Sequence, residues 1–162
     1  MNMTHNPKNK PDSPFSVTQT EDSSGFLLWQ TTVVWQRRIV AVLRPHELTH
    51  TQFVLLASLM WLSQRETLIT QTRLAQHAQL DLMMTSQVLR SLEKRGLLKR
   101  AEHPTDTRAK VLNLTTEGEQ KARAAIPDVE RTDHDFFNTL GSQTRVFNQQ
   151  LVQLIESASP QS

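Results

Sequence analysis

The sequence contains no cysteine and only four glycines. Without cysteine, neither a disulfide framework nor a thiol redox switch can form. The scarcity of glycine leaves little loop, which favours an α-rich architecture. No apolar run approaches the roughly 18 residues of a membrane span, and the opening MNMTHNPKNKP lacks the apolar core of a signal peptide. We therefore expect a cytoplasmic protein without a membrane partner.

Length and composition suit one domain with its own core, since the chain has 162 residues and is 37% hydrophobic. Residues 1–23 differ from the rest, because they mix Pro, Asn, Ser and Thr with few apolar side chains. This composition predicts a disordered N-terminal arm. The arm is either a solvated tail without a role or a segment whose Lys8 and Lys10 make weak phosphate contacts.

Residues 81–95 form the most informative stretch, because on a helix they separate into two faces. Asp81 is a good N-cap, and Gly96 suits the position after a helix end because it can take positive φ. The apolar side comprises Thr85, Val88, Leu89 and Leu92. The opposite side carries Met83, Ser86, Gln87, Arg90 and Lys94. A solvated face usually mixes both charge signs, but this stripe contains no acid.

A β-hairpin is predicted directly after this helix. Residues 97–99 and 111–114 suggest two short strands, and residues 103–108 between them are typical of a turn. From Arg90 to Lys110 the sequence holds seven cations and three acids, a net +4, whereas the whole chain is only +2. Positive charge gathered on one unit is expected where a surface neutralises phosphates. We predict a DNA-binding winged helix-turn-helix over residues 49–119.

Five short motifs follow one another through this region, and their order and spacing resemble those of the MarR family of bacterial transcription regulators. They are Leu74-Ala75, Leu80-Asp81, Leu92-Glu93-Lys94-Arg95-Gly96-Leu97, Asp106-Thr107-Arg108 and Leu114-Thr115-x-Glu117-Gly118. The resemblance implies a dimeric winged-helix protein, often released from DNA by small phenolic or aromatic ligands. The sequence departs from the family in Met83 and Met84, where small hydroxyl residues are frequent, and in Thr107, where a second arginine is common. These differences bear on which bases are read.

Individual roles follow from the two predicted elements. Gln87 and Arg90 should face base edges in the major groove, since Gln suits adenine and Arg suits guanine. Ser86 and Lys94 are better placed for phosphate. Met83 has two interpretations, a contact with a thymine methyl group or simple packing at the helix start.

Arg108 at the wing tip is expected to enter the minor groove, where negative potential is concentrated. Asp106 would hold it through a charge-assisted hydrogen bond; the alternative is a solvent-exposed ion pair on a mobile hairpin. Lys99, Arg100 and Lys110 supply either phosphate attraction or only solubility.

Residues 24–48 and 120–158 are predicted to form a helical dimerisation region. The helix over 24–43 has apolar residues on two sides, so it needs two partners, its own core and a second subunit. The family resemblance implies an isologous dimer; packing within one chain is the alternative. Pro127 is expected to bend or divide the helix that Thr115 caps. The predicted fold class is mainly α with a small β wing, flanked by N- and C-terminal dimerisation helices.

His46-Glu47-Leu48-Thr49-His50 matches the H-E-x-x-H pattern of zinc metalloproteases. The context disagrees, because Pro45 precedes the motif and Thr49 with Gln52 fits a capping box for the next helix. The metzincin continuation needs Gly and His where this chain has Phe53 and Leu56. We expect neither enzymatic activity nor a cofactor or bound metal.

The leading prediction is a sequence-specific regulator, a dimeric repressor that binds double-stranded DNA at a pseudo-palindromic operator and is released by a small aromatic ligand. A winged helix that binds protein is the second interpretation, and a zinc hydrolase using His46 and His50 is the third. The resemblance also implies an effector pocket. Trp35, His50 and Trp61 are possible linings, but large apolar residues at helical spacing are more often core, so no effector residue is assigned.

Overall fold

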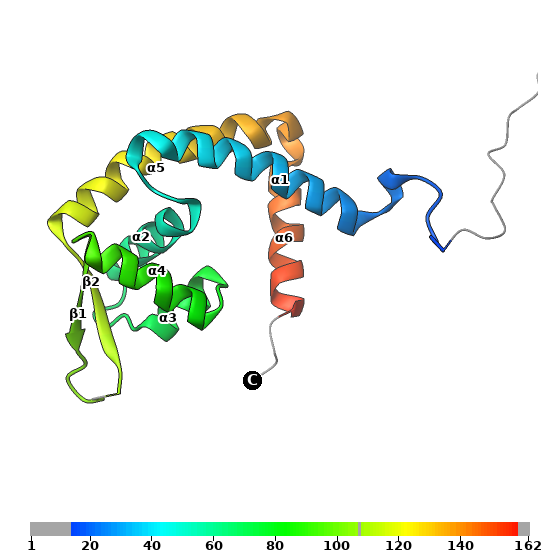
Figure 1. Ribbon diagram of the computed structural model, residues 1–162. Helices are drawn as coiled ribbons and strands as arrows, with labels where there is room; N and C mark the ends of the chain where they lie inside the picture. The colour runs from blue at the N-terminus through cyan, green and yellow to red at the C-terminus, as the bar shows by residue number, and fades with distance from the viewer. Residues whose placement is uncertain (1–13, 107, 159–162) are drawn as a thin grey trace, which may run out of the picture. The chain divides into compact units, whose positions relative to one another are not determined.

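A computed structural model describes residues 14–106 and 108–158, coloured along the chain in Figure 1. The chain divides into two compact units after Arg37. The first unit contains a 3-10 turn (Thr20–Asp22) and the beginning of α1 (Ser24–Leu43). Most of the predicted N-terminal arm, residues 1–13, lies outside the described residues.

The second unit begins with the end of α1 and holds the remaining helices and both strands. Their bounds are α2 (His50–Ser63), α3 (Gln71–Ala78), α4 (Leu82–Lys94), β1 (Leu98–Glu102), β2 (Lys110–Leu114), α5 (Thr116–Phe137) and α6 (Thr144–Ala158). The predicted fold class, mainly α with a small β wing, is confirmed. Within the described part of the chain, no helix is long and apolar enough to cross a membrane.

Four helices begin at residues whose side chains cap them. Thr49 and Gln52 form a complete capping box at the start of α2. Thr70 accepts a hydrogen bond from the Arg73 amide, and Thr115 accepts one from Gly118. At α4, one carboxylate oxygen of Asp81 accepts from two backbone amides of the first turn, each at 2.9 Å. Each cap satisfies amides that the helix itself cannot pair.

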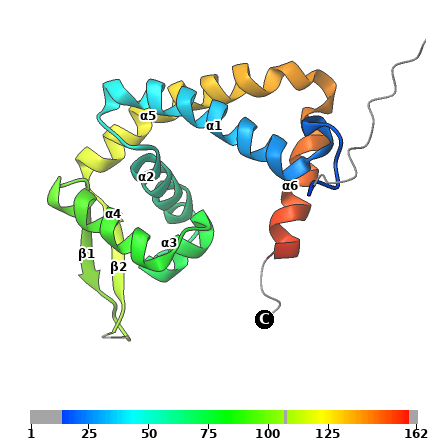
Figure 2. The same cartoon turned by 45° about the vertical axis from the view of Figure 1, so that its right-hand side comes forward.

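The core of the second unit surrounds α2, which contacts α3, α4, α5 and β2; in Figure 2 it lies between α5 and the pair formed by α3 and α4. One stripe of α2, at helical spacing, is buried: Phe53, Leu56, Leu59 and Met60. Leu55 and Leu62 are buried as well. The helix is therefore covered on more than one side, as its central position requires.

β1 and β2 form an antiparallel hairpin, whose register runs from Leu98 opposite Leu114 to Glu102 opposite Lys110. The hairpin is also joined to the segment before α3, because the Leu112 amide donates to the Ile69 carbonyl at 2.8 Å. A single bridge pairs Thr70 with Val111. The base of the wing is thus fixed to the helix-turn-helix.

Of the two outcomes predicted for Pro127, a bend or a division of the helix, α5 excludes the division. The structure contains one continuous helix from Thr116 to Phe137 with Pro127 inside it, and in Figure 1 this helix curves without dividing. Proline removes the amide that would pair with the Arg123 carbonyl. Pro127 and Arg123 are both exposed, so water can satisfy that carbonyl and the helix continues.

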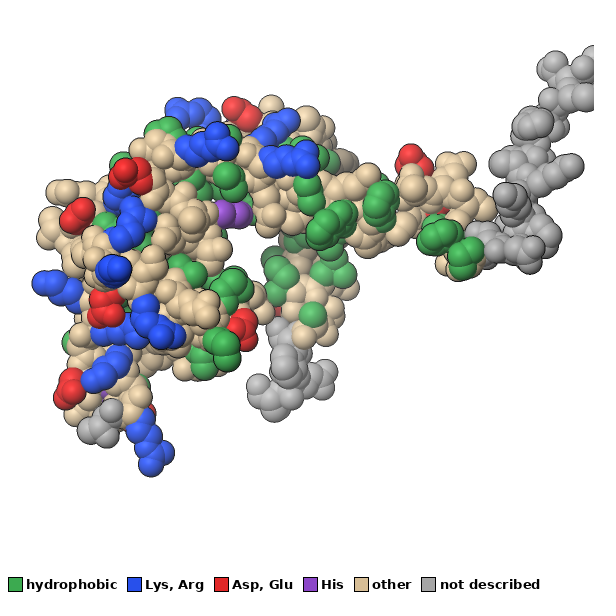
Figure 3. Space-filling view, viewed as in Figure 1, with side chains coloured by type: hydrophobic (Ala, Val, Ile, Leu, Met, Phe, Trp, Pro, Cys, Tyr) green, Lys and Arg blue, Asp and Glu red, His purple; other side chains and the backbone are tan. Residues whose placement is uncertain are grey.

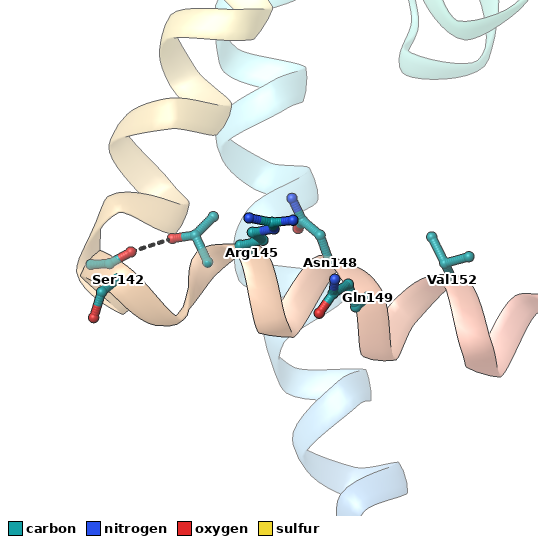
Figure 4. A pocket seen from close by; sticks show the side chains of 7 residues that line it. Ser142, Arg145, Asn148, Gln149 and Val152 are labelled. Carbon is teal, nitrogen blue, oxygen red and sulfur yellow. Dashed lines mark hydrogen bonds between the residues drawn. The ribbon is translucent and has the colours of Figure 1, made fainter.

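α6 has no buried residue in the described chain. A 3-10 segment (Asn138–Gln143) precedes it and contains Gly141 at positive φ. A shallow hollow lies along the helix start, where Arg145, Asn148, Gln149 and Val152 project (Figure 4). The dashed line in that view is the hydrogen bond from Thr144 Oγ1 to the Gly141 carbonyl, 2.9 Å long.

Candidate nucleic-acid interface

α4 has the two faces that the sequence predicts. Thr85, Leu89 and Leu92 are fully buried against the second unit's core. On the opposite side Met83, Gln87, Arg90 and Lys94 are exposed, and Ser86 is half-buried. The structure therefore brings the five predicted residues together as one acid-free stripe along the outside of the helix.

Arg90 lies along this stripe. Its Nε donates to the Ser86 carbonyl and its Nη2 donates to Ser86 Oγ, both at 3.3 Å. Both bonds are near the long end of the normal range. They hold the guanidinium over the preceding turn weakly enough for it to exchange them for a base or phosphate.

The turn of the wing is ordered by Asp106 in a way that differs from the expectation. Its carboxylate accepts a hydrogen bond from the backbone amide of Arg108 at 2.9 Å, and not from the guanidinium. The Ala109 amide donates to the Asp106 carbonyl at 3.0 Å. Asp106 thus shapes the backbone of the turn, and the exposed Arg108 side chain extends from it. Thr107 lies outside the described residues.

His103 is a further residue of this turn, which the sequence analysis did not assign. Its Nδ1 accepts a hydrogen bond from the amide of Asp106 at 3.2 Å. Its position three residues before Asp106, next to Pro104, was the available signal, since side chains in short turns often pair with nearby amides.

The three other predicted cations of the wing have different environments. Lys99 is exposed. Lys110 is also exposed but forms a cross-strand ion pair with Glu102, 3.0 Å between Nζ and Oε1. Such a solvated pair contributes little to stability and leaves Lys110 available for phosphate.

Arg100 is less accessible than expected, with 22% of its side chain exposed. Its Nε lies 3.2 Å from a carboxylate oxygen of Glu93 on α4. Its Nε and one terminal nitrogen are nevertheless buried without a well-directed hydrogen bond. The two observations agree if the pair is a charge attraction with poor hydrogen-bond geometry. Arg100 therefore ties the wing to α4.

A hollow of about 450 Å³ lies between the wing, the start of α3 and the start of α4. Its lining residues are Thr70, Gln71, Thr72, Leu82, Arg100, Asp106, Arg108, Ala109, Lys110 and Leu112. Three of these are cations and one is an acid. The amides at the start of α3 add partial positive charge. The hollow thus continues the positive surface from the wing towards α4.

In Figure 3, Lys and Arg side chains gather over the wing and α4, with few acidic side chains between them. This distribution matches the concentration of charge from Arg90 to Lys110. The face combines an exposed helix with a neighbouring basic hairpin, which is how winged helices present themselves to a duplex.

The H-E-x-x-H segment does not lie on one helix. His46 ends a 3-10 helix, Glu47 has a positive φ of 54°, and α2 begins only at His50. His46 Nε2 lies 2.8 Å from an Asp128 carboxylate oxygen on α5. Burial lowers the pKa of His50, and the nearby Asp133 carboxylate opposes that shift. In the described residues, no three His, Cys, Asp or Glu side chains are grouped to hold a metal.

Of the possible effector linings, Trp35 and His50 are half-buried and Trp61 is exposed. The guanidinium of Arg65 stacks on the Trp61 ring, 3.9 Å from its centre. These positions alone do not define an effector site.

Comparisons with known proteins agree with this geometry. Residues 45–130 match the model of the ArnR1-like winged-helix domain. The chain is 45% identical over 125 residues to the HTH-type transcriptional regulator YdcH of Bacillus subtilis, a match covering 77% of this chain and 84% of that protein. The chain belongs to the MarR family of winged-helix regulators. It is therefore a DNA-binding transcriptional regulator and not an enzyme, so the zinc-hydrolase interpretation is wrong.

Two solved structures show how closely this MarR-family chain follows the fold. The structure of CouR from Rhodococcus jostii bound to p-coumaroyl-CoA is 26% identical, with a TM-score of 0.76 over 90% of this chain and 99% of that one. A MarR variant from E. coli complexed with operator DNA is 22% identical, with a TM-score of 0.71 over 81% and 91%. At that lower identity the second likeness shows the fold alone.

Proposed function

We propose that this chain is a dimeric repressor that binds a pseudo-palindromic operator and is released by a small aromatic ligand. The observation that carries the proposal is the acid-free stripe of α4, exposed opposite a fully buried face and next to the basic wing. A helix with these two faces fits the major groove, which is wide enough to admit it.

The proposed DNA contacts are made to the major groove, the minor groove and the phosphates of the DNA backbone. Gln87 and Arg90 read base edges in the major groove, and Arg108 enters the adjacent minor groove. Ser86, Lys94, Lys99 and Lys110 contact phosphates, and Arg100 adds positive potential from the base of the wing. Asp106 contributes indirectly by shaping the turn that carries Arg108.

Exposed apolar surface supports a dimer. In the first unit, α1 exposes Phe26, Leu27, Leu28, Trp29 and Val34. In the second unit, α6 exposes Val146, Val152, Leu154 and Ile155. Apolar residues gathered on one element usually mark an interface, and a second copy of the chain is the simplest partner for both. We assign residues 24–48 and 120–158 to dimerisation and residues 49–119 to DNA binding.

A two-fold dimer presents two copies of α4, which would enter successive major grooves. Their half-sites should therefore be centred about 10 base pairs apart, or a multiple of one helical turn. The operator should be pseudo-palindromic, because its symmetry mirrors that of the protein.

The structural likeness to CouR, which was solved with p-coumaroyl-CoA, supports an aromatic effector. Adding p-coumaroyl-CoA, or free hydroxycinnamic and hydroxybenzoic acids, to a preformed protein–operator complex tests this part of the proposal. Release at concentrations that leave the protein folded would support it. Binding that is unchanged by any of these aromatic compounds would contradict release by this class.

The base-reading role is tested by comparing Arg90→Ala with Lys94→Ala. Loss of Arg90 should weaken operator binding by about 1–3 kcal/mol and relax base preference, whereas loss of Lys94 should weaken all sequences alike. The measurement is a titration of each variant against the operator and a scrambled duplex. Equal weakening of both duplexes by Arg90→Ala would exclude a base-reading role for this residue.

A further inference from the structure

The first turn of α4 exposes three consecutive apolar side chains. Leu82, Met83 and Met84 are 47%, 72% and 42% exposed. Such exposure rules out packing at the helix start, the alternative interpretation of Met83. Exposing three neighbouring apolar side chains to water is unfavourable. Packing within the fold does not explain these residues, so a contact with another molecule is considered.

The backbone under these side chains is held firmly. The Asp81 carboxylate accepts from the amides of Met83 and Met84 at 2.9 Å each. The Gln71 side-chain amide of α3 donates to the Leu82 carbonyl at 3.4 Å. The exposed side chains therefore project from a fixed turn and not from a loose end.

The apolar turn is continuous with the proposed DNA face. Met83 lies four residues before Gln87 and seven before Arg90, so all three share one side of the helix. Leu82 lines the hollow that also contains Arg100 and Arg108. In Figure 3, hydrophobic side chains are visible on the surface at this end of α4. The start of a recognition helix is also the part that usually approaches base edges.

One group in the major groove matches an apolar side chain, the 5-methyl group of thymine. Methionine suits such a contact because its long, polarisable side chain adapts to the position of a methyl group. We propose that Met83, supported by Met84, reads the 5-methyl group of a pyrimidine beneath the first turn of α4. In unmodified DNA this pyrimidine is thymine. The inference rests on the proposed DNA face and adds a base preference that the polar stripe does not supply.

The experiment removes single methyl groups from the DNA. Each thymine of the operator is replaced in turn by deoxyuridine, which keeps every hydrogen-bonding group. For the natural protein, one or two substitutions per half-site should weaken binding about three- to fivefold, as expected for losing one buried methyl contact. Met83→Ser, which restores a hydroxyl residue, should bind the thymine and uracil duplexes equally. Met83→Leu keeps an apolar side chain and should remain sensitive.

Leu68→Ser provides a control, because Leu68 is an exposed apolar residue outside α4 and the wing. It should retain the full response to uracil. A further comparison places cytosine and 5-methylcytosine at the sensitive position; the methylated duplex should bind better by about the same factor as thymine over uracil. This comparison shows whether the methyl group itself is recognised.

A uracil response that is absent at every position, or that persists in Met83→Ser, would overturn the inference. If the natural protein still prefers the operator over a scrambled duplex, the proposed function survives that result. Loss of this preference in the natural protein would overturn both. Thermal unfolding of Met83→Ser should match that of the natural protein, since the residue is largely exposed.

Discussion

His50 occupies the first position of α2, half-buried and within the electrostatic reach of Asp133 on α5. Burial lowers the pKa of the imidazole below its ordinary value of about 6.5, and the Asp133 carboxylate only opposes this shift. The unfolded chain therefore binds the proton more readily than the folded chain. The free energy of unfolding therefore keeps the full contribution of the neutral imidazole above about pH 6.5, and this contribution is lost as pH falls through the lowered pKa.

His50→Asn should consequently flatten the pH dependence of stability. Between about pH 7 and pH 5, the free energy of unfolding of the variant should fall less than that of the natural protein. Urea unfolding at several pH values measures this. His77→Asn is the control, because His77 is exposed on α3. A pH dependence of His50→Asn that equals that of His77→Asn would contradict the assignment.

At this scale, the sequence predicted the residues whose role depends on their own neighbours in the chain. Asp81, Thr49 and Thr115 all cap as predicted, because a cap bonds to amides two or three positions away. The environment of Arg100 was not predictable in this way, because Glu93 reaches it from another element.

Three hydrogen bonds of Thr115 join the segment after α4 to the start of α5. Thr115 Oγ1 donates to the Gly96 carbonyl at 2.6 Å and accepts from the Gly118 amide at 3.0 Å. The Thr115 amide donates to the Leu97 carbonyl at 3.2 Å. The residues directly after α4 are thus bonded to the start of α5, the helix that continues into the proposed dimerisation region.

Gly118→Ala should destabilise this junction. A Cβ atom at residue 118 would lie 1.8 Å from the Leu97 carbonyl oxygen, so backbone would have to move. Overpacking of this kind typically costs about 1–3 kcal/mol. Thermal and urea unfolding measure the loss. Gly25→Ala is the matched control, since nothing lies within 4 Å of a Cβ there; it should be neutral or slightly stabilising. Equal stability of the two variants would contradict the close approach.

Element boundaries were well predicted where the hydrophobic periodicity of a helix stops at a helix-ending residue such as proline. The predicted helix over 24–43 has the bounds of α1, which ends immediately before the 3-10 turn that contains Pro45. The continuity of α5 through Pro127 was not predictable with certainty, because the outcome depends on whether water reaches the freed carbonyl. Burial of Leu55 and Leu62 could not be predicted from the sequence, because it depends on how many elements surround α2.

For the whole molecule, the proposed dimer makes the exposed apolar residues of α6 sensitive to charge. Leu154→Glu should weaken self-association about tenfold or more, because a carboxylate buried at an apolar interface loses its hydration. Sedimentation velocity over a range of concentrations measures the effect. Gln153→Glu adds the same charge at the neighbouring exposed position and is the control. Unchanged association of Leu154→Glu would exclude this face of α6 from the interface.

Positive charge is distributed unevenly over the whole molecule. The net +4 between Arg90 and Lys110 exceeds the +2 of the whole chain, so the remainder is slightly acidic. The sequence alone was sufficient to place this charge on a winged helix. It did not reveal that Arg100 would be partly covered or that the start of α4 would be exposed and apolar, since exposure depends on the packing of several elements.

The most direct test of DNA recognition is the binding of the full chain to a fluorescent duplex from the region upstream of its own gene. The titration is repeated at several salt concentrations and beside a scrambled duplex. We predict tight binding that prefers the upstream duplex and falls steeply with salt, with a log–log slope of about −0.9 for each phosphate neutralised. If the folded, dimeric protein binds neither duplex at low salt, the proposed DNA recognition is wrong. That result would indicate that the winged helix binds a protein partner.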